Sequence, residues 1–308
     1  MKYQRLLRHR IVNWLHSSLI LSAMASLLSL LGWAIAGVQG VVWAVFTGTL
    51  FVFITPQLSA RRLLRSQGAR EIHPALAPDL YDTARDLARR ADLEKMPHLH
   101  CVPTTIPNAF AVGGPNNSAL AITDGLMRNL SPRELRGVLA HEISHIKHND
   151  TGILRLAEVV RGLTRGISIF GLSLIFLGLP VLWGQSVVSL FVPLLLLSAP
   201  IISGLLQLAL SRTREFAADM EAVRLTGDPV GLASALAKLE RLQRGFFSRL
   251  LQPVGEIPLL KWLRSHPEGR ERIRRLLDLR TTREAGSCQL SAFSSVRNYQ
   301  RSAFSFQL

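Results

Sequence analysis

The fold of this chain is decided by residues 131–148, which read SPRELRGVLAHEISHIKH. The stretch opens with Ser131-Pro132-Arg133-Glu134, a capping box with proline at the first helical position, and so predicts that a helix begins here. That helix runs directly into His141-Glu142-Ile143-Ser144-His145. Histidines four residues apart lie one turn apart on one helix face, where both imidazoles can reach one Zn²⁺ at about 2.1 Å. The sequence therefore predicts a zinc site held by His141 and His145, with the Glu142 carboxylate beside it.

A catalytic zinc site of this kind needs a third protein ligand. His148 lies on the same helix face, but a rise of 1.5 Å per residue puts it about 10 Å from His141 along the axis. We therefore interpret it as a residue at the rim of the site or one that supports a ligand. Glu215 is the better candidate, because Glu215 and Asp219 share a face of a later helix. We expect Glu215 to complete a His₂Glu site and Asp219 to accept an N–H from a ligand imidazole. The alternative for both carboxylates is a solvated face or a salt bridge with a neighbouring arginine.

These residue types predict hydrolysis of peptide bonds. One Zn²⁺ per chain would lower the pKa of a bound water towards about 7 and polarise the scissile carbonyl, while Glu142 would remove the proton and later deliver it to the leaving amine. Two other classes of protein stay open. One is a zinc-binding membrane scaffold without turnover, against which the intact Glu142 argues. The other is a basic protein that binds membrane surfaces or nucleic acid and does not depend on these residues.

Membrane spans are predicted by two blocks without a single Asp, Glu, Lys or Arg, residues 11–56 and 166–210. A membrane helix needs about 20 apolar residues, so each block is long enough for a helical hairpin. We expect four spans, at residues 14–37, 38–54, 167–183 and 187–210. A cleaved signal peptide is the alternative at the N-terminus, but the apolar run is too long and a second span follows at once.

Charge and cysteine content set the expected surroundings. All 36 Lys and Arg residues lie outside the two hairpins, so the positive-inside rule places both termini and the polar segments in the cytoplasm. The net charge of +15 favours anionic lipid head groups as a partner, and we expect no nucleic-acid binding because no recognition motif is present. The two cysteines, Cys101 and Cys288, predict no disulfide in this compartment. The metal site must therefore use histidines and carboxylates.

The polar segments predict a mostly α protein with a small β-sheet. Short runs at His98–Val102, Asn108–Val112 and Ser118–Thr123, separated by Pro- and Gly-rich turns, predict strands before the zinc-binding helix. We expect an N-terminal segment with the first hairpin at residues 1–56 and a second hairpin at residues 166–210. A peptidase domain is predicted in two parts, at residues 57–165 and, with the third ligand, at residues 211–280. A disordered tail is predicted at residues 281–308.

Several segments together resemble the HtpX-type membrane metallopeptidases, to which the CAAX prenyl proteases are more distantly related. The resemblance covers about residues 57–279 and rests on NAFA at 108–111, TDGL at 123–126, HEISH at 141–145, RTREFAAD at 212–219, and SHP at 265–267 with Arg272.

This resemblance implies a gluzincin-like catalytic domain, interrupted by a membrane hairpin, in the bacterial inner membrane. It implies quality control of misfolded or membrane proteins on the cytoplasmic side, with polypeptides as substrates. It also implies roles for residues that spacing does not assign. Asn108, Ala109, Phe110 and Ala111 correspond to an edge strand that holds the substrate backbone, and His266 corresponds to a group that stabilises the oxyanion.

Overall fold

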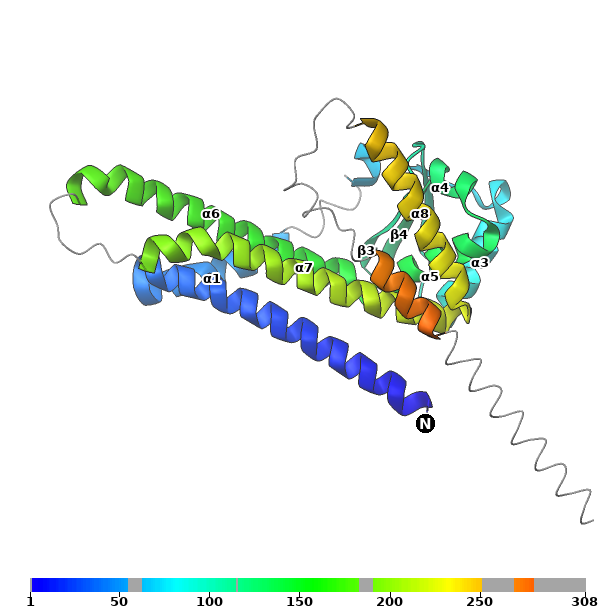
Figure 1. Ribbon diagram of the computed structural model, residues 1–308, viewed down its shortest axis with the longest axis horizontal. Coiled ribbons are helices and arrows are strands. Elements are labelled where there is room, and N and C mark those ends of the chain that lie inside the picture. Colours follow the sequence, from blue (N-terminus) through cyan, green and yellow to red (C-terminus); the bar gives the residue numbers. More distant parts are fainter. Residues whose placement is uncertain (1, 55–62, 115, 183–190, 251–268, 280–308) are drawn as a thin grey trace, which may run out of the picture. The chain divides into compact units, whose positions relative to one another are not determined.

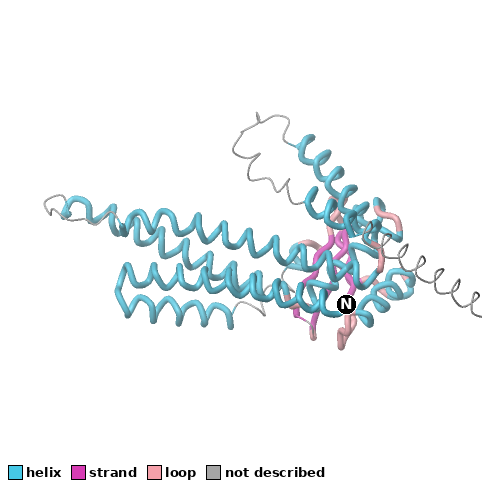
Figure 2. Tube along the Cα trace, turned by 60° about the horizontal axis from the view of Figure 1, so that its bottom comes forward, coloured by secondary structure: helices cyan, strands magenta, loops and turns pink. Residues whose placement is uncertain are grey.

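The computed structural model describes residues 2–54, 63–114, 116–182, 191–250 and 269–279. Helices make up most of this part of the chain, and the strands form one small sheet (Figure 2). The expectation of a mostly α protein with a small sheet is therefore confirmed. His266 and the tail at 281–308, for which we predicted a catalytic role and disorder, lie outside the described residues.

The first apolar block forms α1, Lys2–Ile54, which is broken at one point. Ala36 and Gly37 have non-helical backbone angles, and Gly37 has a φ of 58°, which favours a residue without Cβ. A Cβ added to Gly32 or Gly40 would collide with the backbone of the other residue, so the chain on the two sides of the break lies in close contact. The break falls at the predicted boundary between the first two spans.

The second apolar block forms most of α6, Asp150–Leu182, and α7, Phe191–Thr226, which lie beside α1 (Figure 1). In the described residues, three helices are long and apolar enough to cross a membrane, at Leu15–Leu50, Asp150–Leu177 and Phe191–Thr226. Large apolar side chains on these helices face outward, as lipid contact requires. The three helices share two buried clusters, formed by Met24, Leu28, Ala44, Ala157, Val160 and Leu210 and by Leu31, Leu195, Leu196 and Ala199.

Within the described residues, four strands form a sheet with the order β1-β2-β4-β3. The predicted strands are β2, His98–Val102, β3, Ala109–Gly114, and β4, Asn117–Thr123. β1, Arg70–Glu71, was not predicted, because two residues carry no period-2 pattern. Among the described strands, β3 comes last in this order and is an edge strand; it pairs with β4 in an antiparallel register that sets Ala109 opposite Ile122.

The helix predicted from the capping box is α5, Pro132–Lys147. Glu134 Oε2 accepts the Ser131 backbone N–H at 2.8 Å, and Ser131 Oγ accepts that of Glu134 at 3.4 Å. Burial alone would raise the pKa of Glu134, but hydrogen bonds from Ser131, Ser234 and Lys238 outweigh it and lower the pKa to about 2. Ser234 and Lys238 belong to α8, Pro229–Leu250, so one ionised carboxylate caps α5 and joins it to α8.

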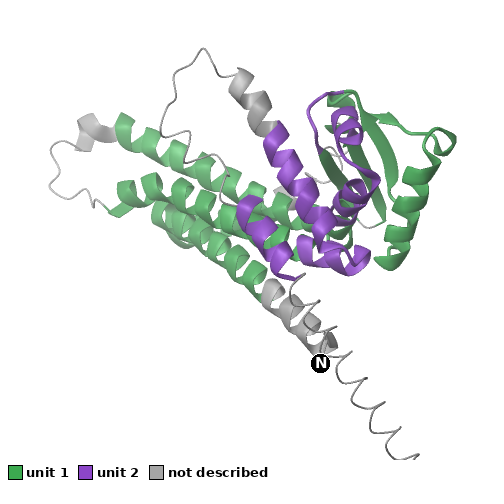
Figure 3. Cartoon of the chain, turned by 45° about the vertical axis from the view of Figure 1, so that its right-hand side comes forward, with its two compact units in different colours: residues 1–103, 109–122, 142–218 green, residues 104–108, 123–141, 219–308 purple. Residues whose placement is uncertain are grey.

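The chain forms two compact units (Figure 3). Unit 1, residues 1–103, 109–122 and 142–218, holds α1, α6 and most of the sheet, together with η1, Pro74–Leu76, and α3, Pro78–Arg90. Unit 2, residues 104–108, 123–141 and 219–308, holds α4, Asp124–Asn129, together with α8 and the helix at 269–279. The divisions at 141/142 and 218/219 fall inside α5 and α7, which are continuous helices.

Candidate active site

The two histidines of α5 project from a helix that packing holds firmly. Leu139, Ile143 and Ile146 on this helix are almost completely buried. His141 is buried as well, at 7% exposure, and the His145 side chain is 13% exposed. Buried apolar residues alternate with the histidines along α5, so a rotation of the helix would expose these apolar residues to water.

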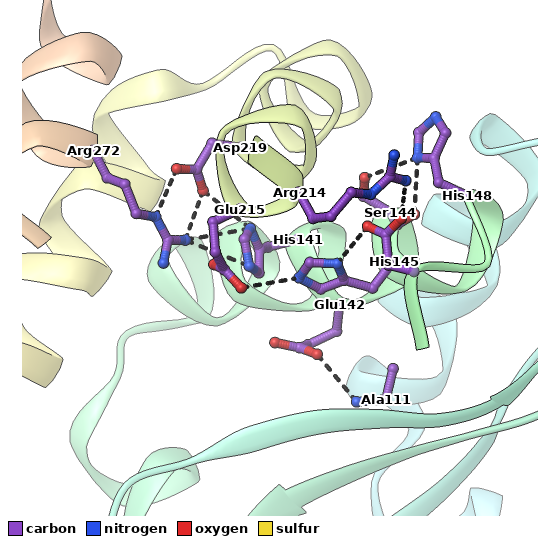
Figure 4. Close-up of polar contacts among 11 residues, drawn as sticks. Ala111, His141, Glu142, Ser144, His145, His148, Arg214, Glu215, Asp219 and Arg272 are labelled. Carbon is purple, nitrogen blue, oxygen red and sulfur yellow. Dashed lines mark hydrogen bonds and ion pairs between the residues drawn. The ribbon is translucent and has the colours of Figure 1, made fainter. Parts of the chain in front are cut away.

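His141 is held by a carboxylate and a guanidinium (Figure 4). Its Nδ1 lies 3.0 Å from Asp219 Oδ1, so Nδ1 carries the proton in this pair and Nε2 has the lone pair that a metal needs. Arg272, from the helix at 269–279, binds both carboxylate oxygens of Asp219 at 2.7 Å. Its Nη2 also lies 3.4 Å from His141 Nε2. Arg272 therefore fixes the orientation of Asp219.

His145 has a second carboxylate partner, which sequence reasoning missed. Its Nδ1 lies 2.7 Å from Asp150 Oδ2, and Asp150 forms an ion pair with Arg214. The other ring nitrogen, Nε2, lies 3.7 Å from Glu215 Oε1. Both histidines thus pair Nδ1 with a carboxylate, and His145 turns Nε2 towards Glu215 (Figure 4).

His141, His145 and Glu215 each offer one ligand atom, and these atoms lie within 4.8 Å of one another. In the part of the chain that is described, no other group of three His, Cys, Asp or Glu residues meets this criterion. Two imidazole nitrogens and a carboxylate oxygen are a donor set that suits Zn²⁺. Ligands of a tetrahedral zinc ion lie about 3.4 Å apart, so small side-chain shifts would close this group around one ion.

Glu142 points from α5 towards the edge strand, where its Oε2 accepts the backbone N–H of Ala111 at 3.1 Å (Figure 4). The pairing of β3 explains why this N–H is available. Asn108 O accepts the Thr123 N–H at 3.0 Å, so the backbone groups of Asn108 and then of Phe110 point towards β4. Those of Ala109 and Ala111 consequently point to the other edge, the one that Glu142 reaches.

His148 does not belong to the group that could hold a metal. Its Nδ1 lies 3.0 Å from the carbonyl oxygen of Ser144, one turn back along the chain (Figure 4). Asp150 was missed because it lies beyond the end of α5, and the spacing of the two histidines does not fix the direction of the chain after that helix. Asn149, with a φ of 52°, makes a turn there and returns the chain so that Asp150 contacts His145.

Comparison with known proteins identifies the family of this chain. The family model described as peptidase family M48 matches residues 74–280. The chain belongs to this family. It is 34% identical over 283 residues to proteins named "Protease HtpX homolog" from Burkholderia mallei (strain SAVP1) and Burkholderia pseudomallei (strain 668), covering 88% of this chain and 98% of each relative. The resemblance to HtpX-type peptidases is thereby confirmed, and the protein is a protease with membrane-spanning helices.

A solved structure, that of S. mikatae Ste24p, has a TM-score of 0.47 to this chain at 18% sequence identity. The similarity covers 88% of this chain and 66% of Ste24p.

Proposed function

We propose that this protein is a zinc-dependent endopeptidase of the bacterial inner membrane that cleaves misfolded or membrane proteins on the cytoplasmic side. The observation that carries the proposal is the grouping of His141, His145 and Glu215 within 4.8 Å, next to the carboxylate of Glu142 on the same helix. Membership of peptidase family M48 supports zinc as the metal, one ion per chain.

The chain's own residues account for the proton transfers of peptide hydrolysis. A zinc ion held by the two histidines and Glu215 would supply a Lewis acid that activates water and polarises the scissile carbonyl. Glu142 takes the proton from the attacking water and passes it to the leaving amine. Asp219 pairs with Nδ1 of His141, so Nε2 is the nitrogen that would bind the metal, and Arg272 holds Asp219. His266 stabilises the oxyanion in this proposal, a role that comes from the family resemblance alone.

The substrate backbone is proposed to add as a strand to the free edge of β3. Of the four residues predicted for this role, Ala109 and Ala111 direct their backbone groups to that edge, whereas those of Asn108 and Phe110 point towards β4. Phe110 contributes a partly exposed side chain instead. A strand bound there lies beside Glu142, which already contacts the Ala111 N–H.

Ala111→Pro tests this edge, because proline removes an N–H that points away from β4 and leaves the pairing with β4 intact. We expect KM for an extended peptide to rise about 2- to 10-fold, the net worth of one hydrogen bond. Ala111→Gly is the matched control, since it keeps the N–H and should retain the wild-type KM. Equal KM values for the two variants would rule out strand addition through Ala111.

The proposed topology has four spans, in which α1 crosses the membrane twice with its turn at Ala36–Gly37. Both hairpins then begin and end in the cytoplasm, in agreement with the positions of the basic residues. The peptidase domain is proposed to consist of residues 57–165 and 211–280, with a gluzincin-like arrangement of ligands. In α7, Glu215 follows Leu210 by five residues, about 7.5 Å along the axis, so the zinc site lies close to the membrane surface.

Removal and return of the metal tests the proposed function. We expect the detergent-purified protein to degrade an unfolded substrate such as casein, to lose this activity with a zinc chelator, and to regain it with one equivalent of Zn²⁺. Bound zinc is measured on the same samples. Zinc binding without any cleavage would favour the scaffold alternative, and cleavage that survives complete metal removal would exclude a zinc peptidase.

A further inference from the structure

The pair formed by Asp150 and Arg214 is the most deeply buried ionic contact next to the metal-binding group. Asp150 is 1% exposed and Arg214 is 5% exposed. Asp150 directs one carboxylate oxygen to Arg214 and the other to His145 Nδ1, at 2.7 Å. A buried carboxylate is costly unless it is paired, and Arg214 supplies the compensating charge.

We propose that Asp150 is a positioning residue for His145, and that Arg214 holds it in place; the inference rests on the proposed function. Asp150 fixes the His145 ring so that Nδ1 donates and Nε2 faces Glu215. As an anionic acceptor it also makes the imidazole a stronger metal ligand. His145 and His141 then have equivalent supports, a carboxylate on Nδ1 and an arginine behind that carboxylate.

The two members of the pair come from the two helices of the second membrane hairpin. Asp150 is the first residue of α6, and Arg214 lies in α7 immediately before Glu215. The ion pair therefore joins α6, whose first residue contacts His145, to α7, which provides the proposed ligand Glu215. The geometry of two metal ligands consequently depends on how α6 and α7 pack together.

A single substitution of Asp150 would have two other effects. It would remove an acidic residue from the first turn of α6, where negative charge stabilises the helix. It would also leave the Arg214 charge buried without its partner. Both problems are avoided by two double variants, Arg214→Met with Asp150→Asn and Arg214→Met with Asp150→Leu. Neither contains the buried ion pair, but only asparagine can still accept the His145 N–H.

The measurements are the zinc dissociation constant, obtained by competition with a chelator, and the visible spectrum of the protein loaded with Co²⁺, which responds to ligand geometry. We expect the asparagine variant to bind zinc about 10-fold more weakly than wild type and the leucine variant about 100-fold more weakly, the range found for such supporting contacts. The Co²⁺ spectrum should change in the same order. Thermal unfolding of the metal-free proteins establishes that both are folded.

Arg133→Met with Asp228→Asn is the control, because this pair joins α5 to the start of α8 and its carboxylate otherwise binds the Gly231 N–H. It should leave the zinc affinity unchanged. If the two Asp150 variants bind zinc as wild type does, or equally weakly with the same Co²⁺ spectrum, the positioning role is wrong. Failure of the wild-type protein itself to bind zinc would instead overturn the proposed function.

Discussion

Glu142→Gln is expected to reduce peptide hydrolysis by about 10²- to 10⁴-fold, the usual contribution of a general base, while the protein keeps its full zinc content. Glutamine has nearly the same shape as glutamate, and its amide oxygen can still accept the Ala111 N–H that Glu142 accepts at 3.1 Å. It cannot take a proton from water. The variant therefore removes one chemical ability and leaves the contact with β3 in place.

The test measures casein cleavage and bound zinc on wild type and Glu142→Gln purified side by side. Glu134→Gln serves as the control, because it also exchanges a glutamate of α5 for glutamine. Glu134 is buried, caps the helix and contacts α8. This control should lower stability by about 1 kcal/mol, the worth of a cap, and keep its activity when folded. Equal activities for Glu142→Gln and wild type would remove Glu142 from the mechanism.

The local parts of this fold could be predicted from the sequence because each depends on a short pattern. The capping box at Ser131 places the start of α5, and the spacing of the histidines places both on one face. Alternating apolar residues between turns locate β2, β3 and β4 to within one or two residues. The boundary of α6 was not predicted, because its first four turns carry charged residues and only its inner face packs against α1.

Contacts between distant segments could be predicted only where a residue type restricted the choice. Asp219 was assigned as the partner of a histidine because it lies four residues from Glu215, and the structure adds that Arg272 holds it. The role of Asp150 depends on a turn at Asn149 with a positive φ. Asparagine favours such a turn after a helix, but it does not tell which side chain Asp150 then contacts. The partner of Arg214 was missed for the same reason.

Glu215→Ala is expected to weaken zinc binding by more than about 100-fold, because it would remove one of the three proposed protein ligands. This loss would exceed the loss for any supporting residue. The rival interpretation places Glu215 on a solvated helix face or in a salt bridge. Its Oε1 lies 3.7 Å from His145 Nε2, on the side of the ring opposite Asp150, which is where a shared metal ion would be held. A surface role would leave zinc binding unaffected.

Asp219→Ala distinguishes the proposed ligand, Glu215, from the residue proposed to support a ligand, Asp219. The comparison is needed because both carboxylates lie on the same face of α7. It should weaken zinc binding by only about 10- to 100-fold, because His141 keeps its place on α5 and loses only its partner on Nδ1. Chelator competition on both variants, with unfolding curves for the metal-free proteins, gives the comparison. The reverse order of affinities would assign the ligand to Asp219. In that case Glu215 would be the residue that supports a histidine. The Glu215 and Asp219 side chains would then have to turn from their directions in Figure 4 when the metal binds.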